Sequence, residues 1–91
     1  MLLEIVSPEA QLFSGEVESI TVPGASGSFQ ILNNHAPIVS TLVAGSIKIQ
    51  GKITLPAAHK SKFTQEGDLV FIDIQSGAIE LRDNKVILLA E

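Results

Sequence analysis

The chain has 91 residues, 45% hydrophobic and 18% charged, so we expect one folded domain over residues 1–91 rather than a disordered chain. Cysteine is absent, which excludes disulfides, a thiol nucleophile and thiolate metal ligands. Tryptophan and tyrosine are also absent, and ten acids against six bases give a net charge of −4. These features argue against a nucleic-acid surface and against an aromatic platform for stacking bases or sugars.

The charges are unevenly placed along the chain. Residues 1–47 hold four acids and no Lys or Arg, whereas residues 48–91 hold six of each. No apolar run reaches the ~20 residues that cross a bilayer. Residues 1–4 show no basic segment ahead of an apolar run, so no signal peptide is expected. We therefore expect a soluble, cytosol-side protein, which is compatible with attachment to a membrane assembly.

Apolar and polar residues alternate along much of the chain, and 22 residues are Val, Ile or Thr, which suit a pleated sheet. No segment of helical length shows a 3.6-residue period. We predict strands, in chain order, at 2–6, 11–13, 17–22, 28–32, 38–42, 46–50, 52–55, 69–75, 78–82 and 85–89. A bulge is expected near Ser19, where the alternation slips by one residue, and an exposed loop or loose ribbon at 56–66. The pattern predicts an all-β fold, a two-sheet antiparallel sandwich or flattened barrel of about ten short strands.

Candidate catalytic and metal-binding residues are few. His35 has no acid within eight residues, and His59 lies beside two lysines, so no metal site is predicted. No Gly-x-Ser-x-Gly segment supports a hydrolase built on His35, although that alternative stays open. Asp68, Asp73 and Glu80 fall at polar strand positions, where a solvated face explains them better than a carboxylate pair does. Residues 24–27 lack the Gly-Lys-Ser/Thr ending of a phosphate-binding loop.

Several ordered segments carry a family resemblance. They are the segments at 7–17 (beginning Ser7-Pro8), at 22–37 (ending His35-Ala36-Pro37) and at 42–49 (Leu42-Val43-Ala44-Gly45-Ser46-Ile47-Lys48-Ile49), the strand pair at 71–81, and the closing strand at 86–91. Together they resemble the N-terminal domain of the ATP synthase epsilon subunit (the delta subunit of mitochondria). His-Ala-Pro within this ordered set is its most specific part.

The resemblance implies a non-catalytic rotor subunit in the central stalk, with no cofactor and no metal. It implies contact with the gamma subunit and with the membrane-embedded c-ring, so that ion flow of protons or sodium is coupled to ATP synthesis. Membrane association would be indirect, at the cytoplasmic face of the bacterial inner membrane. For the c-ring we expect Ser26, Gly27, Ser28, His35, Ala36 and Pro37, with loops 24–28 and 33–37 at one end of adjacent strands. For the gamma subunit we expect Ser7, Ile38, Val39, Ser40 and Leu42, with core burial as the competing role for Ile38 and Leu42.

Three departures from the family pattern stand out. Asn34 replaces the turn glycine, and we expect it to adopt the left-handed conformation that Asn tolerates. Gln30 adds a side chain where the family has glycine, and residues 51–66 are longer than the usual connection. The sequence shows no counterpart of the family's C-terminal helical pair, so neither inhibition nor ATP binding is expected of it. The main alternative is a free-standing ligand-binding β module for carbohydrate, or a lipoyl-like domain, for which Lys48 would have to lie at a hairpin tip.

Overall fold

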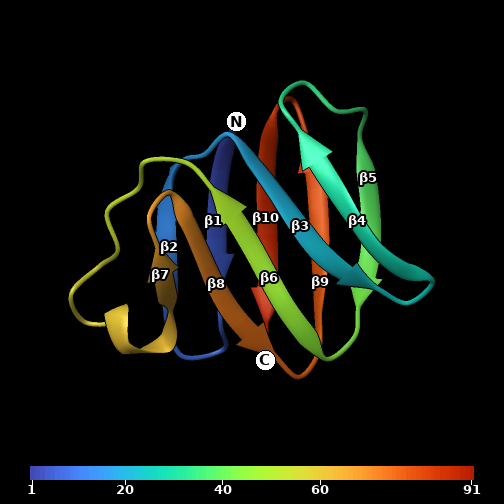
Figure 1. Ribbon diagram of the computed structural model, residues 1–91. Helices are drawn as coiled ribbons and strands as arrows, with labels where there is room; N and C mark the ends of the chain where they lie inside the picture. The colour runs from blue at the N-terminus through green and yellow to red at the C-terminus, as the bar shows by residue number, and fades with distance from the viewer.

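Ten short strands account for most of the chain in the computed structural model, which describes residues 1–91 (Figure 1). The strands are β1 (Leu2–Val6), β2 (Gln11–Glu16), β3 (Ser19–Gly24), β4 (Gly27–Leu32), β5 (Ile38–Leu42), β6 (Gly45–Gln50), β7 (Thr64–Glu66), β8 (Leu69–Ile74), β9 (Gly77–Arg82) and β10 (Lys85–Ala90). The single helical element is a 3-10 turn, Lys60–Lys62, and no helix is long and apolar enough to cross a membrane.

The strands form two layers that face each other. One layer has the order β2-β1-β10-β9-β5, and the other has β3, β6, β8 and β7 in that order, with β4 paired to the outer side of β3. A single bridge between Gly24 and Leu42 joins the layers into one curled sheet. Figure 1 shows the strands of the two layers crossing at an angle. The predicted two-sheet sandwich is therefore confirmed, with one departure: β1 and β10 are parallel, while every other pair is antiparallel.

The core lies between the layers and follows the period-two alternation of the sequence. Successive side chains of a strand point to opposite faces, so alternate apolar residues meet across the gap. Leu3 and Ile5 of β1 and Leu88 of β10 are fully buried on one side, and Ile20 and Ile49 are fully buried on the other. In all, 22 hydrophobic residues form one continuous cluster, so the domain has a single core.

Two sequence predictions of local structure are wrong. Residues 52–55 form no strand, because β6 already pairs with β3 on one edge and with β8 on the other. Ser19 carries no bulge: the register shift lies in the β1–β2 pair, between Ile5 and Val6. At residues 17–18 the chain instead changes layers, since the Val17 amide bonds the Met1 carbonyl and the Glu18 amide bonds the Gln50 carbonyl.

The long connection at 51–63 is anchored at two points. Leu55 and Phe63 are each 9% exposed and belong to the core, whereas Lys60 to Lys62 of the 3-10 turn contribute no buried residue. The short strand β7 then pairs with β8 as an edge strand that the sequence prediction left inside the loose ribbon. The apolar alternation at 53–55 thus reflects anchoring to the core rather than strand pairing.

Candidate interaction surfaces

The β3–β4 turn presents three of the predicted contact residues. Ser26, Gly27 and Ser28 are exposed, and Ala25 and Ser26 form the turn between the paired Gly24 and Gly27. Gly27 has a φ of 123°, which favours glycine, and Gly24 is buried so close to the Phe29 ring that a Cβ there would lie 2.8 Å from a ring carbon. The turn is therefore a rigid, exposed hairpin tip, and no helix follows it that could help to hold a phosphate.

The loop of residues 33–37, between β4 and β5, presents the other three. His35, Ala36 and Pro37 are exposed, and the His35 amide donates to the Leu32 carbonyl at 3.2 Å. The His35 Nδ1 lies 2.7 Å from the Ala36 carbonyl oxygen. Asn34 has a φ of 62°, so the predicted replacement of the turn glycine by Asn is confirmed. Gln30 is exposed on β4, at a position where a side chain longer than that of glycine has access to solvent.

The structure corrects the premise that these two loops share one end of the molecule. They flank the single strand β4, and an antiparallel strand separates its two loops by its own length, about 20 Å for six residues. Figure 1 shows the β3–β4 turn at the lower right and the β4–β5 loop at the top. The six predicted c-ring residues therefore form two separate groups, 26–28 and 35–37.

The residues predicted for the gamma subunit are also separated. Val39 is 79% exposed on β5, and Ile38 and Ser40 are half-buried beside it. Leu42 is 4% exposed and pairs with Gly24 and Gly77, so it belongs to the core and leaves the set of accessible contacts. Ser7 follows β1, and β10 and β9 lie between β1 and β5, which places Ser7 about 14 Å from β5 along the sheet.

The residues around Val39 continue the loop of residues 33–37 into one surface. A shallow hollow of about 380 Å³ is lined by Pro37, Ile38, Val39 and the neighbouring β9 residues Glu80, Leu81 and Arg82. The structure thus brings the 35–37 group together with Ile38, Val39 and Ser40. We call residues 35–40 the β5 surface.

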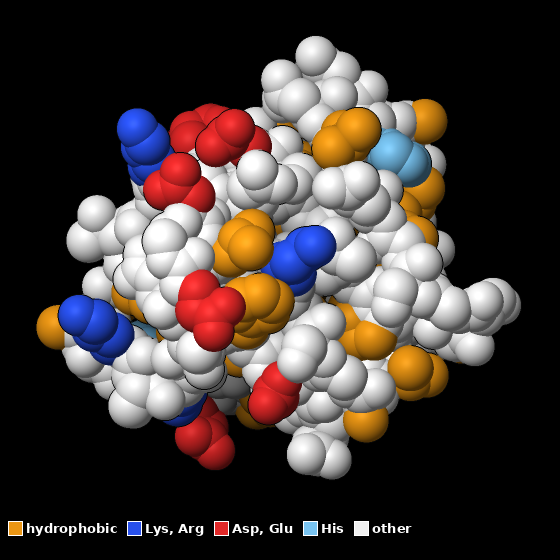
Figure 2. Space-filling view, viewed as in Figure 1, with side chains coloured by type: hydrophobic (Ala, Val, Ile, Leu, Met, Phe, Trp, Pro, Cys, Tyr) orange, Lys and Arg blue, Asp and Glu red, His pale blue; other side chains and the backbone are white.

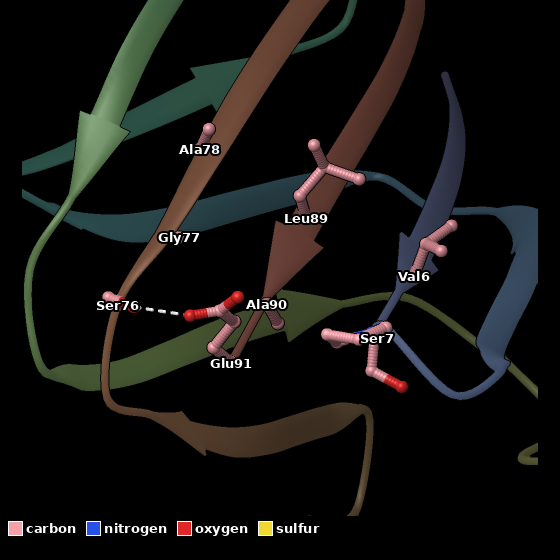
Figure 3. Close-up of a pocket in the computed structure, with 9 residues that line it drawn as sticks. Val6, Ser7, Ser76, Gly77, Ala78, Leu89, Ala90 and Glu91 are labelled. Atoms are coloured by element: carbon pink, nitrogen blue, oxygen red, sulfur yellow. Dashed lines mark hydrogen bonds between the residues drawn. The ribbon is translucent and has the colours of Figure 1, made fainter.

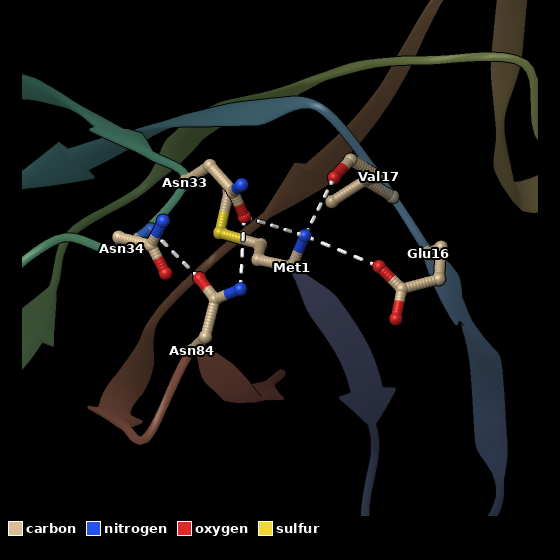
Figure 4. A network of polar contacts seen from close by, with 6 residues as sticks. All are labelled: Met1, Glu16, Val17, Asn33, Asn34 and Asn84. Carbon is tan, nitrogen blue, oxygen red and sulfur yellow. Dashed lines mark hydrogen bonds and ion pairs between the residues drawn. The ribbon is translucent and has the colours of Figure 1, made fainter.

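A network of polar contacts holds the base of this loop (Figure 4). The Met1 amino group donates to the Asn33 Oδ1 at 3.0 Å and to the Val17 carbonyl at 3.1 Å, and it lies 3.2 Å from a Glu16 carboxylate oxygen. Asn84, in the β9–β10 turn, donates from Nδ2 to the Asn33 Oδ1 at 2.9 Å. Its Oδ1 accepts from the Asn34 amide at 2.8 Å. Sequence reasoning missed these contacts, because they join positions that lie far apart in the chain, 50 and 51 residues for the two Asn84 contacts.

Two hollows flank the C-terminal end of β10. The first, of about 540 Å³, is lined by Val6, Ser7, Leu89 and Glu91 among others (Figure 3). The second, of about 550 Å³, has an apolar floor and carries Glu9, Asp73, Glu91 and Lys62 at its polar positions. Ser7 is tied into its own turn, since its hydroxyl donates to the Ala10 carbonyl and accepts from the Ala10 amide, both at 3.2 Å.

No cluster of groups suited to catalysis or metal binding is present. No three His, Asp or Glu side chains gather closely enough to hold a metal ion. Asp73 bonds the Ser46 hydroxyl on the layer opposite Glu80, so these carboxylates do not converge. Lys48 lies within β6, between the buried Ile47 and Ile49, and not at the hairpin tip that a lipoyl-like domain needs.

The distribution of charge marks one side of the molecule. No Asp, Glu, Lys or Arg occurs between Glu18 and Lys48, and this stretch contains the whole of β3, β4 and β5. Figure 2 shows the charged side chains on the left and centre of the face, whereas hydrophobic and neutral groups with one histidine occupy its right side. Depletion of charge is typical of the centres of protein interfaces. We call the surface of residues 19–47 the charge-free side.

Ten short strands in two layers around one core define the class of protein by its fold: a small β-sandwich domain. The family model described as the ATP synthase delta/epsilon chain β-sandwich domain matches residues 1–91, and the chain belongs to this family. The resemblance inferred from the sequence motifs is thereby confirmed.

Two relatives support this assignment, and one solved structure shares the fold. The chain is 38% identical over 90 residues to the ATP synthase epsilon chain of Leptospira borgpetersenii, and the aligned region covers 98% of this chain and 59% of that protein. It is 38% identical over 89 residues to the epsilon chain of Chlorobium limicola, covering 98% and 86%. The fold resembles a chain in the central stalk and c-ring structure of the Tetrahymena thermophila mitochondrial ATP synthase, with a TM-score of 0.75, 16% identity, and coverage of 99% of this chain and 62% of that one. The chain thus spans about three fifths of several relatives that it matches.

Proposed function

We propose that the chain acts as a non-catalytic rotor subunit in the central stalk of an F-type ATP synthase, linking the gamma subunit to the c-ring. Membership of the delta/epsilon family along the whole chain supports this role. A part that transmits torque needs stiffness and two contacts rather than a reactive group. The close-packed core of 22 residues supplies the stiffness.

The observation that carries the proposal is the charge-free side with exposed loops at opposite ends. A connector between two partners requires two separated contact surfaces, and the β3–β4 turn and the β5 surface lie on either end of β4. The absence of charged side chains between Glu18 and Lys48 means that neither the turn nor residues 35–40 bring a charge of their own into a contact. Glu80 and Arg82 of β9 line the hollow beside Val39, so a partner at the β5 surface has to leave these two charges in solvent or pair them.

We assign the two surfaces to different partners. The β3–β4 turn, with Ser26, Gly27 and Ser28, is a narrow hairpin tip that suits contact with the loops of a ring of small subunits. The β5 surface groups Val39, the most exposed large hydrophobic residue, with Pro37 and Ile38 around one hollow, which suits a lasting contact with the gamma subunit. Residues 35–37, which the sequence analysis expected at the c-ring, are therefore proposed for the gamma contact instead. Ser7 remains a separate, weaker candidate for the gamma contact.

The assignment to gamma and the c-ring also implies where the chain is located. A subunit between gamma and the c-ring lies at the cytoplasmic face of a bacterial inner membrane and is attached to the membrane only through the complex. The coupling would serve proton or sodium flow and ATP synthesis without a cofactor in this subunit.

Co-purification with tagged variants tests the proposal. Wild-type chain added to membranes stripped of the native subunit is expected to recover both gamma and c subunits. Val39→Asp is expected to lose most of the gamma recovery, because it replaces an apolar contact by a second carboxylate opposite Glu80. Thr64→Asp, at an exposed β-branched position of the edge strand β7 outside the charge-free side, is the matched control and is expected to retain it. Recovery of neither subunit by the wild-type chain would contradict the proposed function.

A further inference from the structure

We propose that Asn84 is a positioning residue that holds the loop of residues 33–37 in its partner-binding conformation. The identity of the partner rests on the proposed function, but the contacts between Asn84 and the loop are a property of this chain alone. Asn84 lies outside the charge-free side, in the turn between β9 and β10, and its side chain contacts the loop at Asn33 and Asn34.

The contacts of the Asn84 carboxamide are complementary. Its Oδ1 accepts from the Asn34 backbone amide at 2.8 Å, and its Nδ2 donates to the Asn33 Oδ1 at 2.9 Å. One side chain thus binds the loop through both a backbone and a side-chain group. The Asn84 carbonyl also accepts from the Leu2 amide at 3.1 Å, which fixes the turn to the start of β1.

The backbone of the turn explains why Asn stands at this position. Arg82 and Lys85 are paired, and the two residues between them have φ values of 52° for Asp83 and 58° for Asn84. Such left-handed pairs form the tight hairpin turns in which Asn, Asp and Gly are favoured. Only Asn supplies both a donor and an acceptor from this conformation, because the ionised Asp carboxylate only accepts and Gly has no side chain.

The loop has few other restraints beyond this contact. Within it, the His35 amide bonds Leu32 and the His35 ring bonds the adjacent Ala36 carbonyl, and both contacts are local. The Asn33 side chain also accepts from the Met1 amino group at 3.0 Å, so Asn33 is a second residue that restrains the loop. Asn84 and Asn33 therefore fix the position of the loop, which forms the first part of the β5 surface, and neither residue has to touch the partner.

The turn itself offers a matched pair of variants. Asn84→Gly removes the carboxamide while keeping a residue that accepts a positive φ. Asp83→Gly makes the same change one residue earlier, where the side chain is exposed and reaches only Arg82, at 3.9 Å. Both variants alter the unfolded chain alike, so a difference between them reports the contact with the loop.

Two readouts are expected to separate the variants. Amide hydrogen exchange at Asn34, followed by NMR, is expected to quicken about threefold to tenfold in Asn84→Gly and to stay near wild type in Asp83→Gly. Capture of purified gamma subunit is expected to weaken by a similar factor in Asn84→Gly only. Equal exchange at Asn34 in both variants would overturn the inference, and so would faster exchange with gamma capture unchanged.

A second pair of variants tests the same contact if Asn84→Gly fails to fold. Asn33→Asp keeps an accepting oxygen for Asn84 and for the Met1 amino group, so it is expected to retain exchange protection and capture. Asn33→Ala is expected to lose both in part, and equal behaviour of this pair would count against the inference. If the wild-type chain captured no gamma subunit, the proposed function would fail, while the exchange contrast at Asn34 would still decide whether Asn84 holds the loop.

Discussion

Individual residues matter here chiefly where backbones approach closely. Gly77, at the start of β9, lies against the backbone carbonyl of Leu89 with no room for a Cβ. We predict that Gly77→Ala lowers the free energy of unfolding by about 2 kcal/mol, because the two strands would have to move apart. Urea denaturation followed by circular dichroism measures this. The neighbouring Ser76→Ala, at an exposed position, is the control and should change stability by less than about 0.5 kcal/mol; an equal loss in both variants would refute the steric cause.

Asn34 offers a second test at this scale. Its φ of 62° lies in the left-handed region, which glycine and Asn accept and β-branched residues do not. We predict that Asn34→Gly, which restores the residue of the family pattern, leaves stability within about 0.5 kcal/mol, whereas Asn34→Val costs about 1–2 kcal/mol. Thermal unfolding of the two variants distinguishes these outcomes, and a neutral Asn34→Val would show that the loop does not require this conformation.

At the scale of elements, the long connection at 51–63 depends on its anchors. Phe63 is 9% exposed, whereas Lys62 beside it is exposed in the 3-10 turn. We predict that Phe63→Ala lowers the free energy of unfolding by about 3 kcal/mol and frees the connection for proteolysis, because it removes a buried aromatic ring. Lys62→Ala is expected to be near neutral in the same urea and limited-proteolysis measurements. Resistance of Phe63→Ala to both would mean that the connection is held elsewhere.

The elements also show what the sequence could and could not predict. Period-two alternation located most strands, because strands with one buried face must alternate. It failed at Ile53 and Leu55, where alternation serves to anchor a loop, since periodicity reports burial and not hydrogen-bond partners. The parallel β1–β10 pair and the contact of Asn84 with the loop were unpredictable, because they join distant segments. The prediction that loops 24–28 and 33–37 share one end of the molecule is wrong, and the order of strands along the chain already implies this, because the two loops lie at opposite ends of β4.

At the scale of the whole molecule, the proposed role requires two separate contact surfaces, the β3–β4 turn and the β5 surface. The β3–β4 turn is expected to tolerate small substitutions but not a charge that faces a crowded ring. We predict that Ser26→Arg weakens attachment to c subunits about tenfold while gamma recovery stays the same. Ser61→Arg, in the exposed 3-10 turn, is the matched control. Loss of gamma together with the c subunits would show that the turn does not act as an independent contact.

Site-specific photo-crosslinking in assembled complexes tests the central claim most directly. A photoreactive amino acid would be placed at position 26 in one variant and at position 39 in another, and the crosslinked partners would be identified by mass spectrometry. We predict that the first joins a c subunit and the second joins the gamma subunit. The same partner at both positions would contradict a connector with two separate ends.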